Sequence, residues 1–175
     1  YCLSIYMNIQ KIDSPWEHWI VDSFLPPDDY SLMLSWFRDQ PSKTKEEKAH
    51  ADGLGVSYEP HIERILEESF LALLSYTEFN SRGVITYELH KMLPDESFDS
   101  PHCDTKSKLA SLVLYVGAPN KGTFIHESKD SEGVEVEWKQ NRALLFFPKQ
   151  GVTWHSYNNY STSSDRCTAL LNIRR

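Results

Sequence analysis

Residues 109–147, LASLVLYVGAPNKGTFIHESKDSEGVEVEWKQNRALLFF, decide the fold class of this chain. They hold four short apolar runs, at 109–116, 122–126, 134–138 and 142–147, which are rich in β-branched and aromatic residues and are separated by turn residues. Similar runs lie at 84–93, 153–156 and 167–173. Seven strands between residues 83 and 175 predict a closed or double-sheet β architecture rather than an α/β one.

The region before residue 83 shows helical patterns. A strand at 19–25 ends at a Pro-Pro pair, and Asp28 or Asp29 then begins a helix that runs to about Arg38, with Leu32, Leu34 and Phe37 among its apolar positions. A second helix, at about 60–76, repeats apolar residues at helical spacing: Ile62, Ile65, Leu66, Phe70 and Leu73. Residues 40–57 are polar and predict an exposed loop. We therefore expect an α+β, mainly β fold: a sandwich or jelly roll with two N-terminal helices packed on it.

Composition narrows the class of protein. The 175 residues suit one domain, with the N-terminal strand and helices at about 16–78 and the β core at about 83–175. A net charge of −7 argues against a broad phosphate-binding surface, so nucleic acid is a poor candidate partner. Three cysteines form no CxxC motif, and no apolar run reaches the roughly 20 residues that span a bilayer. We expect reduced thiols and a cytoplasmic location without a membrane contact.

The chain contains a short motif typical of non-haem iron sites. Such sites hold Fe(II) with two histidines and one carboxylate and leave coordination positions open. A His-x-Asp/Glu element on a strand places two of these ligands on one side. With 7 histidines and 25 acidic residues among 175, about one such element arises by chance, and this chain has three, at 50–52, 61–63 and 102–104. The element alone therefore indicates little.

Context selects one of the three elements. The pair at 61–63 falls in the second predicted helix, where a two-residue step separates the side chains by about 200°. The pair at 50–52 falls in the polar loop. His102 and Asp104 stand directly before the apolar run at 109–116, which offers a rigid neighbour. They are the candidate metal ligands.

Two later elements complete the pattern. His155 follows a buried run and a turn, so it could fold back over the first pair as the third ligand. Taken alone, His155 fits a surface imidazole on an edge strand better than a metal ligand. Arg166 and Thr168 follow on the last predicted strand and share a face by period two, whereas Cys167 faces the other way. An arginine fork beside a hydroxyl suits a carboxylate ligand.

In this order, the motifs resemble those of the Fe(II)/2-oxoglutarate-dependent oxygenases, and in particular the small prolyl-hydroxylase-like members of microbial and phage type. The similarity rests on HCD, LASLVLYVG, KGTF, NRALLFFP, WHSYNN and RCTALLNI, within residues 83–175. The segment WEHWIVDSFLPPDDYSLMLSWF also resembles the strand-then-helix entrance of these enzymes. The resemblance thus covers nearly the whole chain.

The resemblance implies a double-stranded β-helix core, a hydroxylase activity and a set of cofactors. It implies Fe(II) on His102, Asp104 and His155, with O2 and 2-oxoglutarate as co-substrates and ascorbate as a candidate reductant. It also implies Arg166 as the anchor for the far carboxylate of 2-oxoglutarate, assisted by Tyr115 and, less directly, by Thr168. The reaction would couple C–H hydroxylation to decarboxylation of 2-oxoglutarate to succinate, with a prolyl residue of a peptide or protein as the leading substrate. Because Asp104 is present, hydroxylation is favoured over halogenation.

Several positions depart from the family or leave its chemistry open. Prolyl hydroxylases carry a tyrosine before the His-x-Asp element that points toward the metal, and here Tyr87, His90 and Met92 are all imperfectly placed for that role. Cys103 should point away from the metal. His18 and His126 have no evident partner in the sequence and are expected to be structural or exposed.

Three other functions compete with prolyl hydroxylation. The same chemistry could act on a free amino acid or another small molecule. Nucleobase demethylases of the same superfamily carry an arginine six residues after the first, where this chain has Asn172. A cupin-like β barrel that binds a metal without oxygenase activity would show no dependence on 2-oxoglutarate.

Overall fold

The computed structural model describes residues 6–40, 59–94, 97–158 and 164–175. The predicted loop at 40–57 and the pair at 50–52 thus lie almost wholly outside the described residues. The elements follow in this order: β1 (Asn8–Ile12), β2 (His18–Asp22), α1 (Pro27–Arg38), α3 (Pro60–Leu74), β3 (Val84–Met92), β4 (Ser97–His102), β5 (Lys108–Val116), β6 (Thr123–His126), β7 (Val134–Val136), β8 (Ala143–Phe146), β9 (Trp154–Asn158) and β10 (Arg166–Arg174).

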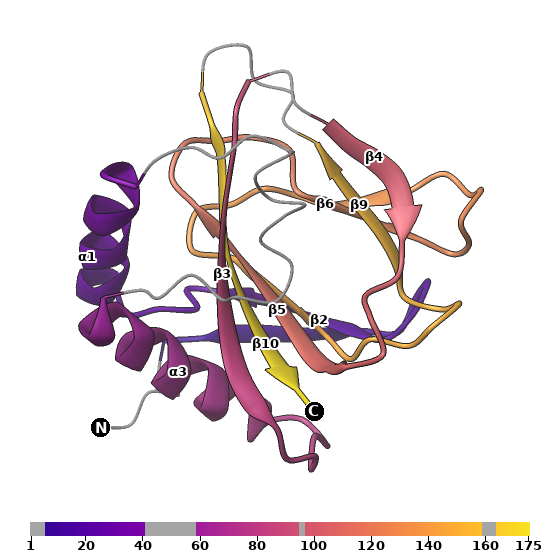
Figure 1. The fold of residues 1–175 in the computed structure, drawn as a ribbon, viewed down its shortest axis with the longest axis horizontal. Helices are drawn as coiled ribbons and strands as arrows, with labels where there is room; N and C mark the ends of the chain where they lie inside the picture. The colour runs from indigo at the N-terminus through magenta and orange to yellow at the C-terminus, as the bar shows by residue number, and fades with distance from the viewer. Residues whose placement is uncertain (1–5, 41–58, 95–96, 159–163) are drawn as a thin grey trace.

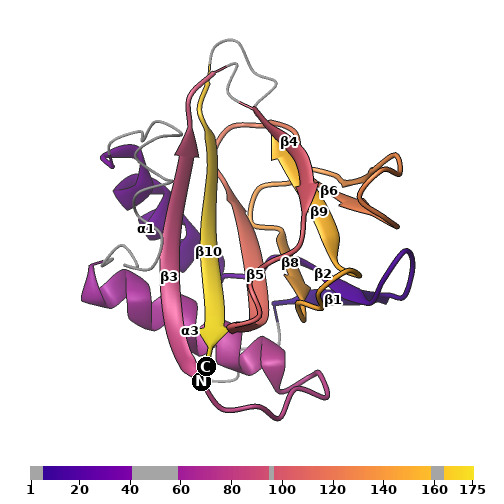
Figure 2. The ribbon, with the colours of Figure 1, turned by 45° about the vertical axis from the view of Figure 1, so that its right-hand side comes forward.

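The strands form two antiparallel sheets. The larger sheet has the order β1-β2-β8-β5-β10-β3, and the smaller has the order β4-β9-β6-β7. The two helices lie against the outer face of the larger sheet, and the smaller sheet lies on its other side, as Figures 1 and 2 show. The mainly β fold with two N-terminal helices is confirmed. No described helix is long and apolar enough to cross a membrane.

Both helices begin where the sequence indicates and bury one face. Each has a proline in its first turn, a position where the missing N–H costs nothing. In α3 the five apolar residues expected at helical spacing are all buried, as predicted. In α1 the buried face is Tyr30, Met33 and Phe37, whereas Leu32 is 42% exposed. Leu32 therefore lies on the solvent side of α1.

Strand β10 separates the apolar core from the functional face. Ala169, Leu171 and Ile173 are buried in the core with residues of the two helices, and the half-buried Cys167 packs against the same core. The alternate residues point into the space between the two sheets. Of these, Arg166, Thr168 and Asn172 are polar yet each is at most 1% exposed. A single strand therefore builds the hydrophobic core on one face and a polar site on the other.

Two strands escape the sequence patterns. β1, NIQKI, is an edge strand with three exposed residues, and β4, SFDSPH, contains a proline and several polar residues. Edge strands tolerate both features because one side makes no ladder hydrogen bonds. β2 also ends at Asp22 rather than at residue 25, since Ser23 adopts a φ of 54°, which breaks the extended backbone.

Candidate active site

Two histidines from neighbouring strands lie side by side at one end of the pocket. His102 at the end of β4 and His155 on β9 are direct cross-strand partners, and their ring centroids are 4.4 Å apart. Nδ1 of His155 lies 3.0 Å from the carbonyl oxygen of Thr153, and Nδ1 of His102 lies 3.4 Å from that of Ser100. A carbonyl can only accept, so each Nδ1 carries the proton and each Nε2 keeps its lone pair. This is the tautomer that a metal-binding histidine needs.

Burial keeps both imidazoles neutral. It lowers the pKa of His102 to about 4, with the neighbouring His155 adding to the effect. Burial also lowers the pKa of His155, which is 6% exposed. Two neutral imidazoles can therefore lie side by side near pH 7, and both can act as nitrogen donors to a metal ion.

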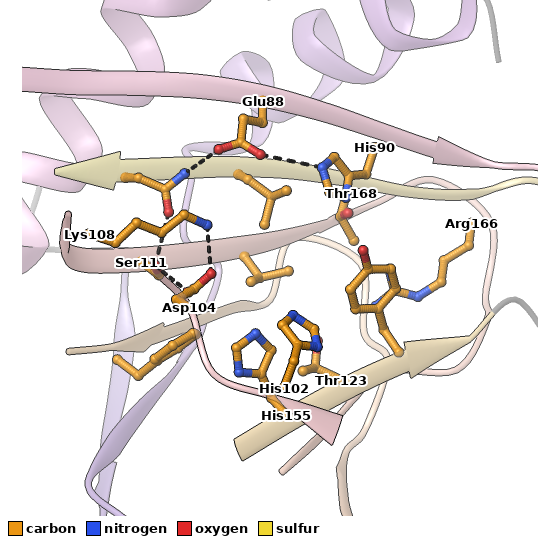
Figure 3. A pocket seen from close by; sticks show the side chains of 15 residues that line it. Glu88, His90, His102, Asp104, Lys108, Ser111, Thr123, His155, Arg166 and Thr168 are labelled. Carbon is orange, nitrogen blue, oxygen red and sulfur yellow. Dashed lines mark hydrogen bonds and ion pairs between the residues drawn. The ribbon is translucent and has the colours of Figure 1, made fainter. Parts of the chain in front are cut away.

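Asp104 lies in the same pocket but engages other partners. β4 ends at His102, so Asp104 belongs to the connection between β4 and β5 rather than to a strand. Its Oδ1 forms an ion pair of 2.7 Å with Lys108, and its Oδ2 accepts a hydrogen bond of 2.9 Å from Ser111 (Figure 3). Among the described residues, no group of three or more His, Cys, Asp or Glu has the geometry of a metal site. The three predicted ligands line one pocket, but only the two histidines are adjacent.

Asp104 is nevertheless ionised. Burial raises the pKa of this carboxyl, but the charge of Lys108 and the hydrogen bonds from Lys108 and Ser111 outweigh it, so the pKa lies below its ordinary value. The donor set lining the pocket is thus two neutral imidazoles and one carboxylate. This is the donor chemistry of a facial Fe(II) site.

Arg166 lies at the opposite end of the pocket. It is 1% exposed, its Nε donates to the carbonyl oxygen of Lys121 at 3.1 Å, and its Nη2 has no hydrogen-bond partner among the described residues. The rings of Trp138 and Tyr157 lie 5.5 and 5.1 Å from the guanidinium carbon. Burial lowers the pKa of Arg166, yet an arginine in a protein keeps its charge. The site therefore contains a buried cation with a spare donor directed at no residue described.

Thr123 stands beside this end of the pocket and was missed by the sequence patterns. Its Oγ1 is buried and lacks a hydrogen-bond partner within the described ranges, as does Arg166 Nη2. Both residues line the pocket, together with Thr168 (Figure 3). Thr123 comes from β6, in the other sheet, so no spacing along the chain indicated that it would meet Arg166. Two buried donors without partners in one pocket suit an anionic ligand such as a carboxylate.

Tyr115 occupies a supporting position. Its hydroxyl donates to the carbonyl oxygen of Val136 at 3.2 Å and accepts from the backbone N–H of Thr123 at 2.9 Å. Its ring stacks on Trp138 with centroids 4.7 Å apart and an interplanar angle of 12°. Tyr115 is fully buried and is not among the residues that line the pocket. The structure thus places Tyr115 behind Thr123 and Trp138 rather than at the pocket surface.

Strand β3 contributes a histidine and a carboxylate rather than a tyrosine. Tyr87 faces helix α3, where its hydroxyl donates to Glu67 at 3.0 Å, and Met92 is buried outside the pocket. Glu88 and His90 face the pocket, with 3.5 Å between Oε2 and Nε2. The hydrogen bond with His90, together with other cationic neighbours, lowers the pKa of Glu88 to about 2.

The remaining histidines have structural partners. Nδ1 of His126 lies 2.9 Å from the carbonyl oxygen of Ser131, and its Nε2 lies 2.9 Å from the hydroxyl of Ser156. Nδ1 of His18 lies 2.8 Å from the carbonyl oxygen of Trp16. His61 lies on α3, outside the pocket. Of the two His-x-Asp/Glu pairs that the structure describes, the pair at 102–104 lines the pocket and the pair at 61–63 does not. The role of the pair at 102–104 as a metal-binding element stays a prediction.

Comparisons with solved structures support the fold. The chain is similar to a prolyl 4-hydroxylase from Pseudomonas putida, with a TM-score of 0.61 and 16% identity over 90% of this chain and 87% of that one. It is similar to a viral collagen prolyl hydroxylase from Paramecium bursaria Chlorella virus 1 in complex with 2-oxoglutarate, with a TM-score of 0.56 and 12% identity over 90% and 94% of the two chains.

A third similar structure is a prolyl hydroxylase from Trichoplax adhaerens in complex with a peptide from the oxygen degradation domain of hypoxia inducible factor. Its TM-score is 0.59, with 12% identity over 90% of this chain and 83% of that one. No family model and no curated protein matches the sequence. The resemblance to prolyl hydroxylases, which belong to the Fe(II)/2-oxoglutarate oxygenases, is thus confirmed by structure. At these identities the likeness establishes the fold alone.

Proposed function

We propose that this protein is an Fe(II)- and 2-oxoglutarate-dependent hydroxylase with a double-stranded β-helix core. The observation that carries the proposal is that the two ends of the pocket differ. One end has a pair of neutral histidines, and the other has the buried guanidinium of Arg166, whose Nη2 has no hydrogen-bond partner among the described residues. A small dicarboxylic acid that chelates a metal at one end needs a cation at the other. The fold of known prolyl hydroxylases supports the same reading.

The proposed metal ligands are His102, His155 and Asp104. The donor set fits Fe(II), since two neutral nitrogens and one carboxylate would leave one net positive charge on the metal and open positions for co-substrates. Iron supplies the oxidative chemistry when it is bound. Asp104 would have to exchange its ion pair with Lys108 for the metal, while Ser111 could continue to donate to the second carboxylate oxygen.

The proposed co-substrate anchor is Arg166 with Thr123. The Nη2 of Arg166 and the Oγ1 of Thr123 would donate to the far carboxylate of 2-oxoglutarate, and each would then gain the partner that it lacks among the described residues. Thr168, beside them on the pocket wall, is a third donor. Tyr115 would act indirectly, because its hydroxyl holds the backbone of Thr123 and its ring supports Trp138. Lys121 would orient the guanidinium through its carbonyl oxygen.

The proposed substrate is a prolyl residue of a peptide or protein. Two of the similar structures are named for collagen and for a peptide of hypoxia inducible factor, which supports a polypeptide substrate for this fold. A nucleobase is a weaker candidate, because Asn172 stands where demethylases carry an arginine and its amide donates to Glu88 at 3.0 Å. A free amino acid or another small molecule would be handled by the same metal chemistry.

Mass spectrometry tests both parts of this proposal. Purified protein with Fe(II), 2-oxoglutarate and oxygen should form succinate, and a proline-containing peptide pool treated in the same way should gain one oxygen atom on proline. Succinate formation without peptide oxidation would retain the oxygenase and remove the prolyl substrate. Metal binding without any dependence on 2-oxoglutarate would overturn the oxygenase and favour a metal-binding β barrel.

A further inference from the structure

Tyr157 is placed between the two ends of the pocket. It follows His155 by two residues on β9, so both side chains lie on the pocket face. Its ring centroid lies 6.3 Å from that of His102, in an edge-on arrangement, and 5.1 Å from the guanidinium carbon of Arg166. It also lies 6.2 Å from the ring of His90, across the pocket on β3. One rigid ring therefore contacts the histidine end, the arginine end and the opposite sheet.

The two ends that Tyr157 joins are themselves fixed. The histidine rings are held by the carbonyl oxygens of Ser100 and Thr153, and they belong to paired strands. Arg166 is held by the carbonyl oxygen of Lys121 and by the ring of Trp138, which stacks on Tyr115. The guanidinium thus has little freedom to withdraw. The span between the two ends is set by the fold rather than by flexible side chains.

A ligand that reaches from one end to the other must run past the ring of Tyr157. A longer acid, anchored at the same two points, has to bend its extra methylene group out of line, toward the pocket wall that Tyr157 helps to form. The ring of Tyr157 acts on such a ligand through its size and its fixed position on β9.

We propose that Tyr157 sets the chain length of the 2-oxo acid, so that the five-carbon 2-oxoglutarate fits and the six-carbon 2-oxoadipate does not. This inference rests on the proposed function, because it needs a 2-oxo acid that spans the histidine and arginine ends. It goes further by assigning co-substrate selectivity to a residue that neither binds the metal nor pairs with the carboxylate.

Calorimetric titration of the Mn(II)-loaded protein with the two acids tests the inference without turnover. One methylene group in a fitted pocket changes the ratio of two ligands' affinities by about 10- to 200-fold. The wild-type dissociation constant should therefore be lower for 2-oxoglutarate than for 2-oxoadipate by that factor. Tyr157→Val should reduce the preference to about threefold or less, whereas Tyr157→Phe, which keeps the ring, should retain it. Leu170→Ala is the matched control, since it enlarges another part of the pocket wall and should leave the preference unchanged.

The ratio of the two dissociation constants separates selectivity from general damage. Loss of the ring also removes a contact of Arg166, which weakens both acids and cancels in the ratio. Tyr157→Leu provides a second truncation if Tyr157→Val does not fold. An unchanged preference in a folded truncation variant that still binds 2-oxoglutarate would overturn the role of Tyr157 alone. A wild-type protein that binds neither acid would overturn the proposed function and this inference with it.

Discussion

The two ends of the pocket differ in whether their buried polar groups have hydrogen-bond partners. At the arginine end, Arg166 Nη2 and Thr123 Oγ1 are buried without a hydrogen-bond partner among the described residues. At the histidine end, both carboxylate oxygens of Asp104 have partners in Lys108 and Ser111. A buried polar group without a partner costs about 1–3 kcal/mol. Under the proposed function, the arginine end would gain hydrogen bonds from its ligand, whereas Asp104 at the histidine end would have to exchange its bond to Lys108 for one to the metal.

Loss of a metal ligand should give the largest effect. Asp104→Ala removes the carboxylate proposed as a metal ligand and leaves Lys108 without the ion pair of 2.7 Å, so turnover of 2-oxoglutarate to succinate should fall below detection. Succinate measured by mass spectrometry is the readout. Asp13→Ala is the matched control, because the Asp13 side chain is 84% exposed and lies far from the pocket. Undiminished turnover by Asp104→Ala would show that the ligand assignment is wrong.

Removal of the Arg166 guanidinium should weaken the binding of 2-oxoglutarate without lowering the stability of the fold. Arg166→Met loses a charge-assisted pair with the co-substrate worth about 1.5–3 kcal/mol, or about 10- to 150-fold in the dissociation constant of 2-oxoglutarate. The free energy of unfolding should stay level or rise, because an unpaired buried cation is replaced by an apolar side chain. Calorimetry and urea denaturation measure the two quantities.

Arg174→Met on the same strand is the control for Arg166, since Arg174 pairs with Glu88 and should not affect 2-oxoglutarate. An Arg166→Met protein that loses stability but binds 2-oxoglutarate normally would show that the guanidinium has a structural role.

The histidine end should make the stability of the metal-free protein depend on pH. The pKa of His102 is about 4 in the folded protein, against about 6.5 in an unfolded chain. Below pH 6.5 the unfolded chain takes up a proton that the folded protein does not. The free energy of unfolding of the metal-free protein should therefore fall between pH 6.5 and 4, by on the order of 3 kcal/mol from this residue. In urea denaturation, His102→Asn should flatten this slope, and an equal slope in both proteins would contradict the assignment.

Thr123 should have a smaller and purely local effect. Thr123→Val keeps the shape of the side chain but removes the hydroxyl, which should weaken 2-oxoglutarate binding by about 2- to 12-fold, the value of one net hydrogen bond. The melting temperature should not decrease, because the hydroxyl has no partner to lose among the described residues. Thr123→Ser should restore the affinity. A Thr123→Val protein with full affinity would remove Thr123 from the anchor.

Lys108 should oppose metal binding. Because Lys108 holds Asp104 Oδ1 at 2.7 Å, Lys108→Met should free the carboxylate and tighten the binding of Mn(II) by about two- to tenfold. Lys106→Met, an exposed neighbour, should have no effect. Weaker Mn(II) binding in Lys108→Met would mean that Lys108 orients Asp104 for the metal instead of competing with it.

The sequence predicts those parts of the molecule that depend on local pattern. The strands from β5 onward follow from short runs rich in β-branched and aromatic residues. Both helices and the opposite faces of Arg166 and Cys167 follow from periodicity. β4 could not be predicted in this way, since its pairing with β9, rather than its own residues, makes it a strand. The pairing of His102 with His155 rested on the order of the motifs, and it is the register of these two strands that brings the rings together.

The rest of the site depends on contacts between distant segments. Thr123 and Arg166 line the same pocket although β6 and β10 lie in different sheets, and a lone threonine in a strand gives no signal of this. Lys108 precedes the predicted strand at 109–116 and no role was expected for it, although its side chain reaches back to Asp104 four residues earlier. Tyr115 was assigned to the co-substrate by resemblance; its hydroxyl bonds to backbone groups of Val136 and Thr123, and its role toward a co-substrate stays a prediction.

The visible absorption spectrum of the protein under anaerobic conditions tests the central claim most directly. Fe(II) chelated by a 2-oxo acid gives a weak charge-transfer band that neither component gives alone. The band should appear when both Fe(II) and 2-oxoglutarate are added to wild type, and Arg166→Met should need a much higher concentration of the acid to produce it. Wild-type protein that binds Fe(II) yet shows no band at saturating 2-oxoglutarate would contradict the proposed site.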